Sequence, residues 1–250
     1  MSPVVDATSE STRTDAVTAA VDAARAGEVV VIPTDTVYGI GCDAFSPEAV
    51  MAVLDAKGRG REMPPPVLVP DVRTLDGLAR SVPTWVRDLV AEAWPGPLTV
   101  ILHAQNSLVW DLGETRGTVA LRMPDDEIAL AVLSEVGPMA VTSANRTGQP
   151  PARTVLDAAT QLGPAVAVYV DGGPREDNQP STIVDCTGEH PEVVRAGAFP
   201  ADRVHEIYAA AQAVAGTTPS PEPEVPAEGA PPHRPAPTPS PEPTATPDES

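Results

Sequence analysis

Residues 29–32 read VVVI, an unbroken β-branched run that ends at Pro33. Such a run is typical of a strand that is covered on both faces, since a strand with one solvent face would alternate apolar and polar residues. Just before it, small apolar residues recur at helical spacing over residues 14–26, and Gly27 is placed to end that helix in the left-handed conformation. A helix that leads into a doubly covered strand favours an α/β fold.

The alternation of helices and strands continues along the chain. Ser46-Pro47-Glu48 supplies an N-cap, a proline at the first helical position and an early acid, which predicts a helix to Lys57 that Gly58 closes. Further strands are predicted at 67–69, 98–102, 119–121, 139–142, 166–170, 183–184 and 193–194, and further helices at 84–93, 126–136, 154–162 and 201–213. We therefore predict an open twisted sheet with helices on its faces.

Proline is distributed unevenly along the 250 residues. Residues 217–250 hold 12 of the 31 prolines and almost no large apolar side chain. Such a segment cannot bury enough surface to offset its loss of conformational entropy, so we expect a disordered, acidic, proline-rich tail. The remaining chain predicts a flexible N-terminus over residues 1–13 and one folded domain over residues 14–213.

The net charge of −19 restricts the class of partner. The tail accounts for part of it and leaves about −14 on the folded part, which argues against a large nucleic-acid footprint. We expect a cytoplasmic protein, since the N-terminus has no secretory pattern, no apolar run could span a membrane, and the two cysteines are too few for a disulfide framework. The four histidines are scattered and predict no zinc site, and the standard nucleotide-binding loops are missing.

The stretch Lys57-Gly58-Arg59-Gly60-Arg61 concentrates positive charge. In an extended chain the three cations would project to one side, with glycines that let a ligand approach the backbone. Arginine forks and a lysine charge suit phosphate oxygens. The same residues could also form a solvated cluster that offsets the dipole at a helix end, and spacing alone leaves both interpretations open.

Hydroxyl and amide groups follow several predicted strands, where ligands bind in open α/β sheets. Ser143-Ala144-Asn145 is one such stretch, and Thr34, Thr36 and Ser181 lie in others. These side chains could contact a ligand or form local turns.

Six short motifs occur in the order PTDTVYGIG (33–41), AKGRGREMP (56–64), WPGPLT (94–99), LRMP (121–124), SAN (143–145) and STIVD (181–185). In this order and spacing the chain resembles the short, single-domain form of the YrdC-like threonylcarbamoyl-AMP synthases, over about residues 17–210. The resemblance implies a mixed α/β sheet with a concave cationic cavity that holds ATP beside L-threonine. Many relatives read Asn-Pro-Leu followed by a histidine where this chain has Met63-Pro64-Pro65-Pro66 and then Leu68.

The resemblance also implies the roles of individual residues. ATP contacts are implied for Lys57, Arg59, Arg61, Thr118, Ser143, Asn145 and Arg195. Threonine contacts are implied for Thr34, Arg122, Val141 and Ser181.

The implied reaction joins L-threonine, bicarbonate and ATP into threonylcarbamoyl-AMP and pyrophosphate, with Mg²⁺ on the ATP phosphates and no protein nucleophile. Lys57 and Arg59 would position the reactants and stabilise negative charge. A separate transferase would pass the product to tRNA. An RNA-binding module is the main alternative, and the acidic charge disfavours direct RNA binding. A carbamoyl-transfer domain of a hydrogenase-maturation protein is a second alternative, but its usual acylphosphatase-like and zinc-finger segments are missing.

Overall fold

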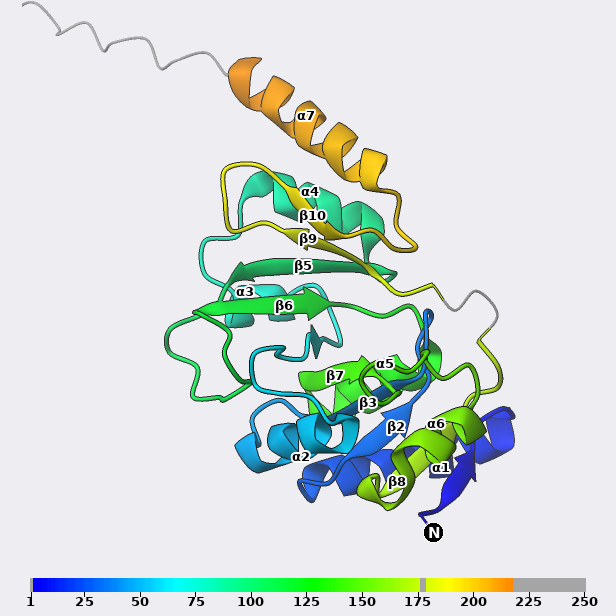
Figure 1. Cartoon of the computed structure of the whole chain (residues 1–250). Helices are drawn as coiled ribbons and strands as arrows, with labels where there is room; N and C mark the ends of the chain where they lie inside the picture. Colours follow the sequence, from blue (N-terminus) through cyan, green and yellow to red (C-terminus); the bar gives the residue numbers. More distant parts are fainter. Residues whose placement is uncertain (1, 176–178, 218–250) are drawn as a thin grey trace, which may run out of the picture. The chain divides into compact units, whose positions relative to one another are not determined.

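The computed structural model describes residues 2–175 and 179–217 (Figure 1). The strands are β1 Val4–Asp6, β2 Val30–Ile32, β3 Gly39–Asp43, β4 Val67–Leu68, β5 Leu98–His103, β6 Thr118–Arg122, β7 Met139–Ser143, β8 Val168–Asp171, β9 Thr182–Asp185 and β10 Glu192–Arg195. The α-helices are α1 Glu10–Arg25, α2 Pro47–Lys57, α3 Thr74–Leu78, α4 Thr84–Ala93, α5 Glu127–Val136, α6 Val155–Leu162 and α7 Ala201–Thr217, and a short 3₁₀ helix spans Gly163–Ala165. The predicted α/β class is confirmed.

The described strands form one sheet of ten, in the order β1-β8-β2-β3-β7-β4-β6-β5-β9-β10. The sheet is mixed. Four neighbouring pairs are parallel, namely β1–β8, β2–β8, β4–β6 and β5–β9. The other five pairs are antiparallel. The first residues of some strands therefore lie beside the last residues of their neighbours.

Helices cover both faces of the sheet and divide the core in two. On one face, α1 and α5 pack over apolar side chains of β2, β4, β7 and β8. On the other face, α2, α4, α6 and α7 pack over side chains that include those of β5 and β6. The run at residues 30–32 is fully buried, as a strand covered on both sides requires.

The α1–α5 face is only partly covered. Along β5, β6 and β9, side chains alternate between buried positions, such as Val100, Leu121 and Val184, and half-buried positions, such as Ile101 and Ala120. The buried positions belong to the opposite face, because they pack with α4. The half-buried positions belong to the α1–α5 face and line a cavity there, so a single sheet supplies both a core and an open ligand surface.

Helix ends follow the local sequence signals closely. The Ser46 side chain accepts a hydrogen bond from the backbone N–H of Ala49, and Gly58 closes α2 with φ of 62°. Gly27, after α1, has φ of 78°. Both predicted glycine stops are therefore confirmed.

The expectation of a flexible segment over residues 1–13 is wrong where the structure describes it. Val4 and Val5 lie in β1, which pairs in parallel with β8 at the end of the sheet, and α1 already begins at Glu10. Two apolar residues are too short a signal for a strand, and only the neighbouring β8 provides the hydrogen bonds that order them. Of the predicted tail, residues 217–250, only Thr217 is described, as the last residue of α7 (Ala201–Thr217), and the rest lies outside the described residues. None of the helices in residues 2–175 and 179–217 combines the length and the apolar character that a membrane-spanning segment requires.

Candidate active site

Two cavities of about 210 Å³ each lie on the open part of the sheet. The Arg122 cavity is lined by Thr34, Thr36, Val37, Gly39, Arg59, Pro66, Leu68, Thr99, Arg122, Val141, Thr142, Ser143, Pro151, Pro180, Ser181 and Arg195. The Thr118 cavity is lined by Arg59, Pro64, Pro65, Pro66, Ile101, Leu112, Thr115, Thr118, Val119, Ala120, Thr142, Ile183 and Arg195. The two cavities share Arg59, Pro66, Thr142 and Arg195, so they adjoin along these side chains.

Arg122 ends β6 and is 6% exposed. Its Nε donates to the Gly96 carbonyl at 3.0 Å, its Nη1 donates to Thr36 Oγ1 at 3.0 Å, and its Nη2 pairs with the Asp35 carboxylate. Burial lowers the pKa of the guanidinium, and Asp35 opposes that shift. Asp35 therefore stabilises a buried positive charge in the cavity wall.

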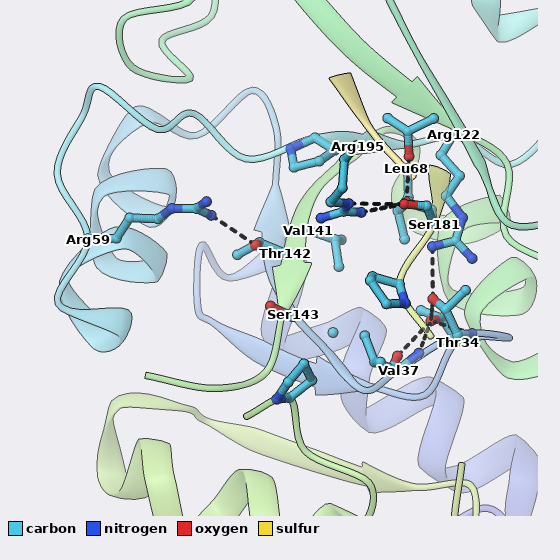
Figure 2. A pocket seen from close by; sticks show the side chains of 16 residues that line it. Thr34, Val37, Arg59, Leu68, Arg122, Val141, Thr142, Ser143, Ser181 and Arg195 are labelled. Atoms are coloured by element: carbon cyan, nitrogen blue, oxygen red, sulfur yellow. Dashed lines mark hydrogen bonds between the residues drawn. The ribbon is translucent and has the colours of Figure 1, made fainter. Parts of the chain in front are cut away.

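Internal hydrogen bonds stabilise the loop of residues 34–37, which precedes β3 (Figure 2). Thr34 Oγ1 donates to the Val37 carbonyl at 2.6 Å, and the backbone N–H groups of Thr36 and Val37 donate to it at 3.3 Å. Since the Thr34 proton is used on Val37, the 3.1 Å contact between the two threonine hydroxyls has Thr36 as the donor. Arg122, Thr36, Thr34 and Val37 thus form one directed chain of hydrogen bonds.

Two residues in the wall of the Arg122 cavity contact each other. They are Arg195, at the end of β10, and Ser181, just before β9. Arg195 donates to the Ser181 carbonyl through Nε at 3.1 Å and Nη2 at 2.6 Å. The Ser181 hydroxyl also lies 2.9 Å from the hydroxyl of Thr99, which is buried. Burial lowers the pKa of Arg195, and the charges of Arg122 and Arg59 lower it further, which places three cations close to one another.

The three cations at 57, 59 and 61 do not point to one side, so the prediction from their alternation is wrong. Gly58 takes the left-handed conformation, and the chain turns at the point where the prediction assumed an extended segment. Only Arg59 lines the cavities, and its Nη1 donates to Thr142 Oγ1 at 3.0 Å. Arg61 Nη2 instead donates to both carboxylate oxygens of Asp111, at 2.7 Å to Oδ1 and 2.9 Å to Oδ2.

Lys57 is buried and lines neither cavity. Its Nζ donates to the carbonyl of Ser143 and, at 2.6 Å, to the carbonyl of Asn145. Burial, reinforced by the charge of Arg59, lowers the Lys57 pKa to about 8. The ammonium group therefore holds together the end of β7 and the turn that follows it.

Of the residues that the resemblance implied, the structure brings most to the two cavities. Thr34, Arg59, Arg122, Val141, Ser143, Ser181 and Arg195 line the Arg122 cavity, and Thr118 lines its neighbour. Lys57, Arg61 and Asn145 line neither. The Asn145 amide nitrogen donates to the carbonyls of Arg146 and Gln149, at 2.9 and 2.7 Å, and closes a turn.

Sequence reasoning missed Thr99 as a cavity residue, although Thr99 ends the motif WPGPLT. Thr142 was part of the candidate stretch Thr142-Ser143-Ala144-Asn145 but was given no role of its own, and it lines both cavities. Leu68 lines the Arg122 cavity at the position after the Pro64-Pro65-Pro66 run, where the chain departs from many relatives, and contributes an apolar wall.

The electrostatics of the joined cavities favour anions. Among the described residues, neither Arg59 nor Arg195 forms an ion pair with a carboxylate, whereas Arg122 has Asp35. Where the cavities adjoin lie two partly buried guanidinium groups that form no salt bridge within the described residues, although the charge of Glu62 partly opposes the lowering of the Arg59 pKa by burial. Within residues 2–175 and 179–217, no group of three His, Cys, Asp or Glu side chains could hold a metal ion.

The fold and site together define an α/β protein with cavities lined in part by arginine side chains on the open face of a mixed sheet. The chain belongs to the Sua5/YciO/YrdC family, whose sequence profile, described as telomere recombination, matches residues 22–197. A putative threonylcarbamoyl-AMP synthase of Mycobacterium tuberculosis (strain CDC 1551 / Oshkosh) is 49% identical over 207 residues, which are 83% of this chain and 95% of that protein. The threonylcarbamoyl-AMP synthase of Bacillus subtilis (strain 168) is 35% identical over 206 residues, 81% of this chain and 60% of that one.

Solved structures show the same fold. Pyrococcus abyssi Sua5 complexed with L-threonine matches with a TM-score of 0.78 and 29% identity, over 82% of this chain and 61% of that one. Escherichia coli YciO matches with a TM-score of 0.71 and 25% identity, over 79% of this chain and 97% of that one. The chain thus spans about three fifths of the Bacillus and Pyrococcus proteins and nearly all of the mycobacterial one.

Proposed function

We propose that this chain is an L-threonylcarbamoyladenylate synthase, which converts L-threonine, bicarbonate and ATP to threonylcarbamoyl-AMP and pyrophosphate. Relatives that carry the name threonylcarbamoyl-AMP synthase support this function, and one of them matches 83% of the chain. The observation that carries the proposal is the pair of adjoining cavities with Arg59 and Arg195 between them. A reaction that joins an amino acid to a nucleotide needs two neighbouring sites, and the two adjoining cavities support the proposal in this respect.

In this proposal the Arg122 cavity takes threonine. Its wall combines a buried cation, Arg122, with the apolar side chains of Val37, Leu68 and Val141. A guanidinium fork suits a carboxylate, and an apolar surface suits the threonine methyl group. The L-threonine complex of Pyrococcus abyssi Sua5 supports an amino acid as ligand of this fold.

The Thr118 cavity takes the nucleotide. Its walls are largely apolar. Ile101 of β5 and Ala120 of β6 contribute to them, together with Pro64, Pro65 and Leu112. An adenine ring fits apolar walls, whereas its phosphates need the cations at the shared wall. The α-phosphorus would then lie near Arg59 and Arg195.

The proposed reaction has two steps. The threonine amine condenses with bicarbonate to give a carbamate and water, and a carbamate oxygen then attacks the α-phosphorus and expels pyrophosphate. Both steps bring anions together at the shared wall. Arg59 and Arg195 would hold them in contact and stabilise the charge that develops in the transition state, so the enzyme is a nucleotidyltransferase that acts by positioning and electrostatics.

We infer that Mg²⁺ enters with ATP and neutralises phosphate oxygens. Magnesium prefers oxygen ligands and is often bound through substrate phosphates. The nearest carboxylate to Arg122, that of Asp35, is already paired with it, so the cavity walls offer phosphate-binding cations in place of a metal cage. The product would pass to a separate transferase that modifies tRNA in the cytoplasm.

Pyrophosphate release measures this function directly. We expect release that requires ATP, threonine and bicarbonate together, with a product whose mass is that of threonylcarbamoyl-AMP. Release from ATP alone, or release that is indifferent to bicarbonate, would contradict the proposal. Omission of each substrate in turn is the matched control.

A further inference from the structure

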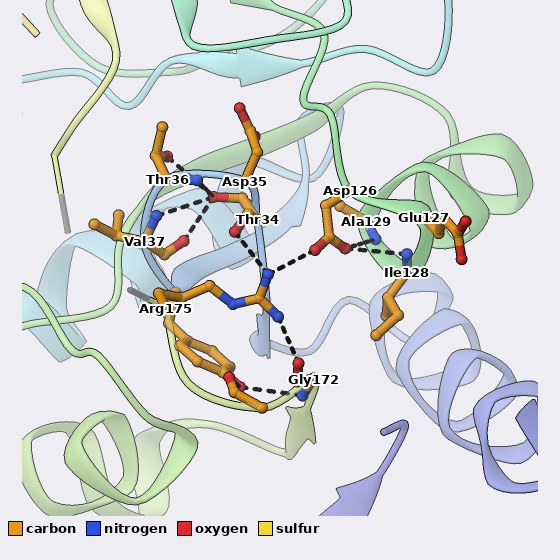
Figure 3. Close-up of polar contacts among 12 residues, drawn as sticks. Thr34, Asp35, Thr36, Val37, Asp126, Glu127, Ile128, Ala129, Gly172 and Arg175 are labelled. Atoms are coloured by element: carbon orange, nitrogen blue, oxygen red, sulfur yellow. Dashed lines mark hydrogen bonds and ion pairs between the residues drawn. The ribbon is translucent and has the colours of Figure 1, made fainter. Parts of the chain in front are cut away.

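Arg175 lies in the connection between β8 and β9 and joins three separate segments of the chain (Figure 3). Its Nη1 donates to the Thr34 carbonyl at 3.2 Å and to Asp126 Oδ2 at 2.9 Å. Its Nη2 donates to the Gly172 carbonyl at 2.7 Å. The side chain is 16% exposed, so these contacts are formed largely away from solvent.

Asp126 supplies the charge that holds Arg175 in place. Its Oδ1 accepts hydrogen bonds from the backbone N–H groups of Ile128 and Ala129, at 3.0 and 2.9 Å, and so caps α5. Its Oδ2 is left for Arg175, and the side chain is 10% exposed. Asp126 therefore contacts the helix N-terminus through one carboxylate oxygen and Arg175 through the other, so its side chain is held from two sides.

Tyr38 adds a third support. The guanidinium carbon of Arg175 lies 5.5 Å from the centre of the Tyr38 ring, which is within cation–π range. The Tyr38 hydroxyl donates to the Gly173 carbonyl at 2.7 Å and accepts from the Gly172 N–H at 3.1 Å. Tyr38 directly precedes β3, and its hydroxyl thereby fixes Gly172 and Gly173, which begin the connection between β8 and β9.

The loop of residues 34–37 is therefore held on two sides. On the cavity side Arg122 contacts Asp35 and Thr36, and on the far side Arg175 contacts the carbonyl of Thr34. Neither Arg175 nor Asp126 lines the Arg122 cavity. Any effect of these two residues on a ligand in that cavity must therefore act through the loop.

We propose that Arg175 and Asp126 are positioning residues for the amino-acid substrate, and that they set the affinity for threonine by fixing the loop that orients Arg122. This inference rests on the proposed function. A guanidinium can reach Thr34, Asp126 and Gly172 at once because it is a planar fork, whereas an ammonium group can keep the charge but not this geometry. The pair thus acts at a distance on one substrate and leaves the nucleotide side of the shared wall unchanged.

The test compares Arg175→Lys and Asp126→Asn with Glu127→Gln. Asn keeps a capping oxygen for α5 but removes the charge that holds Arg175. Glu127 is the adjacent residue and pairs with Arg13 at 2.6 Å on the surface, so its variant breaks an ion pair at the same helix end without touching the loop. We expect KM for threonine and the calorimetric Kd for threonine to rise about tenfold in the first two variants and less than about twofold in Glu127→Gln.

A structural defect would act differently, since general loosening raises KM for ATP and lowers kcat as well. We expect both to stay within about twofold, and the double variant Arg175→Lys/Asp126→Asn to bind threonine no more weakly than the worse single variant, because the two residues act as one unit. Unchanged threonine affinity in both single variants, with or without a lower melting temperature, would overturn the inference. Failure of the unaltered protein to bind threonine would instead overturn the proposed function.

Discussion

Three cations within five residues have three different surroundings, and that difference is testable one residue at a time. Arg59 lines both cavities, Lys57 is buried against β7, and Arg61 pairs with Asp111. We expect Arg59→Ala to lower kcat for pyrophosphate release by about 10²- to 10³-fold, as loss of one electrostatic contact in a transition state typically does. Arg61→Ala, the matched control, should change kcat by less than about threefold, because its charge is already neutralised outside the cavities.

The comparison uses steady-state kinetics together with melting temperatures. An Arg61→Ala defect as large as that of Arg59→Ala would mean that Arg61 leaves Asp111 and contacts the nucleotide. An Arg59→Ala variant with normal kcat would remove the shared wall from the mechanism.

Burial of Lys57 predicts how stability varies with pH. Its pKa is lowered from 10.5 to about 8 in the folded protein, so folding releases a proton between these values. The cost of burying the charge is fully present below pH 8 and disappears as the pH rises toward 10.5, because unfolded chains then lose the proton as well. We expect the free energy of unfolding, relative to Lys57→Met, to rise between pH 7.5 and 9.5, by at most about 1.4 kcal/mol per pH unit.

Urea unfolding of both proteins at the two pH values measures this difference. All other titrating groups are common to the two proteins and cancel. Parallel pH dependence of the two proteins would show that Lys57 keeps an ordinary pKa in the fold.

The contacts of Lys57 could not be predicted from the sequence. The alternation with Gly58 and Gly60 was visible, and so was the helix end at Gly58, yet the two observations imply different directions for the lysine side chain. Once Gly58 is left-handed, Lys57 belongs to the helix and not to an extended segment. Its partners, the carbonyls of Ser143 and Asn145, lie 86 and 88 residues away along the chain. No local pattern could identify them.

At the scale of elements, β3 and β7 approach each other closely because β3 carries glycines. A Cβ at Gly41 would lie 2.6 Å from Val141 Cγ2 and 2.8 Å from the Ala140 carbonyl oxygen. We expect Gly41→Ala to lower the free energy of unfolding by about 1–3 kcal/mol, the usual cost of overpacking. Gly77→Ala in α3 is the control, since nothing lies within 4 Å of its Cβ and alanine favours a helix.

Chemical denaturation gives both values. Equal stability of Gly41→Ala and the unaltered protein would mean that β3 and β7 can separate without cost. Destabilisation by Gly77→Ala of the same size would point to a general intolerance of added methyl groups.

Element prediction was accurate for α2 at residues 47–57, where the cap signals were clear, and for α4 at residues 84–93, and it failed for β3 and α3. The β3 sequence Gly39-Ile40-Gly41-Cys42-Asp43 has two glycines and so lacks β propensity, but the close fit against Val141 requires them. The α3 helix has five residues, too few for a periodic signal. Tertiary contacts decide both elements.

At the scale of the whole molecule, the site lies on the face of the sheet and not beyond the carboxyl ends of its strands. Arg122 ends β6, whereas Thr99 lies near the start of β5 and Ser181 just before β9, and all three line one cavity. The expectation that ligands bind where strands end holds for neighbouring strands that run in parallel. Antiparallel pairs such as β5–β6 bring starts and ends together, and strand order could not be derived from the sequence without the family resemblance.

Residues 217–250 are expected to contribute little to folding or to activity. The described residues up to Gly216 form one compact unit. The helix α7 is anchored in it through buried Val204 and Ile207 and through Tyr208, whose ring centre lies 5.3 Å from that of Trp85. We expect truncation after Gly216 to leave the melting temperature and kcat nearly unchanged, because the proline-rich composition beyond it offers little apolar surface to bury. Truncation after Phe199, which removes α7, should instead lower the melting temperature by several degrees, since it exposes apolar side chains of the α4 face. Thermal melts and pyrophosphate release on both truncated chains decide the matter. A loss of activity on removal of residues 217–250 alone would show that this segment contributes to the site.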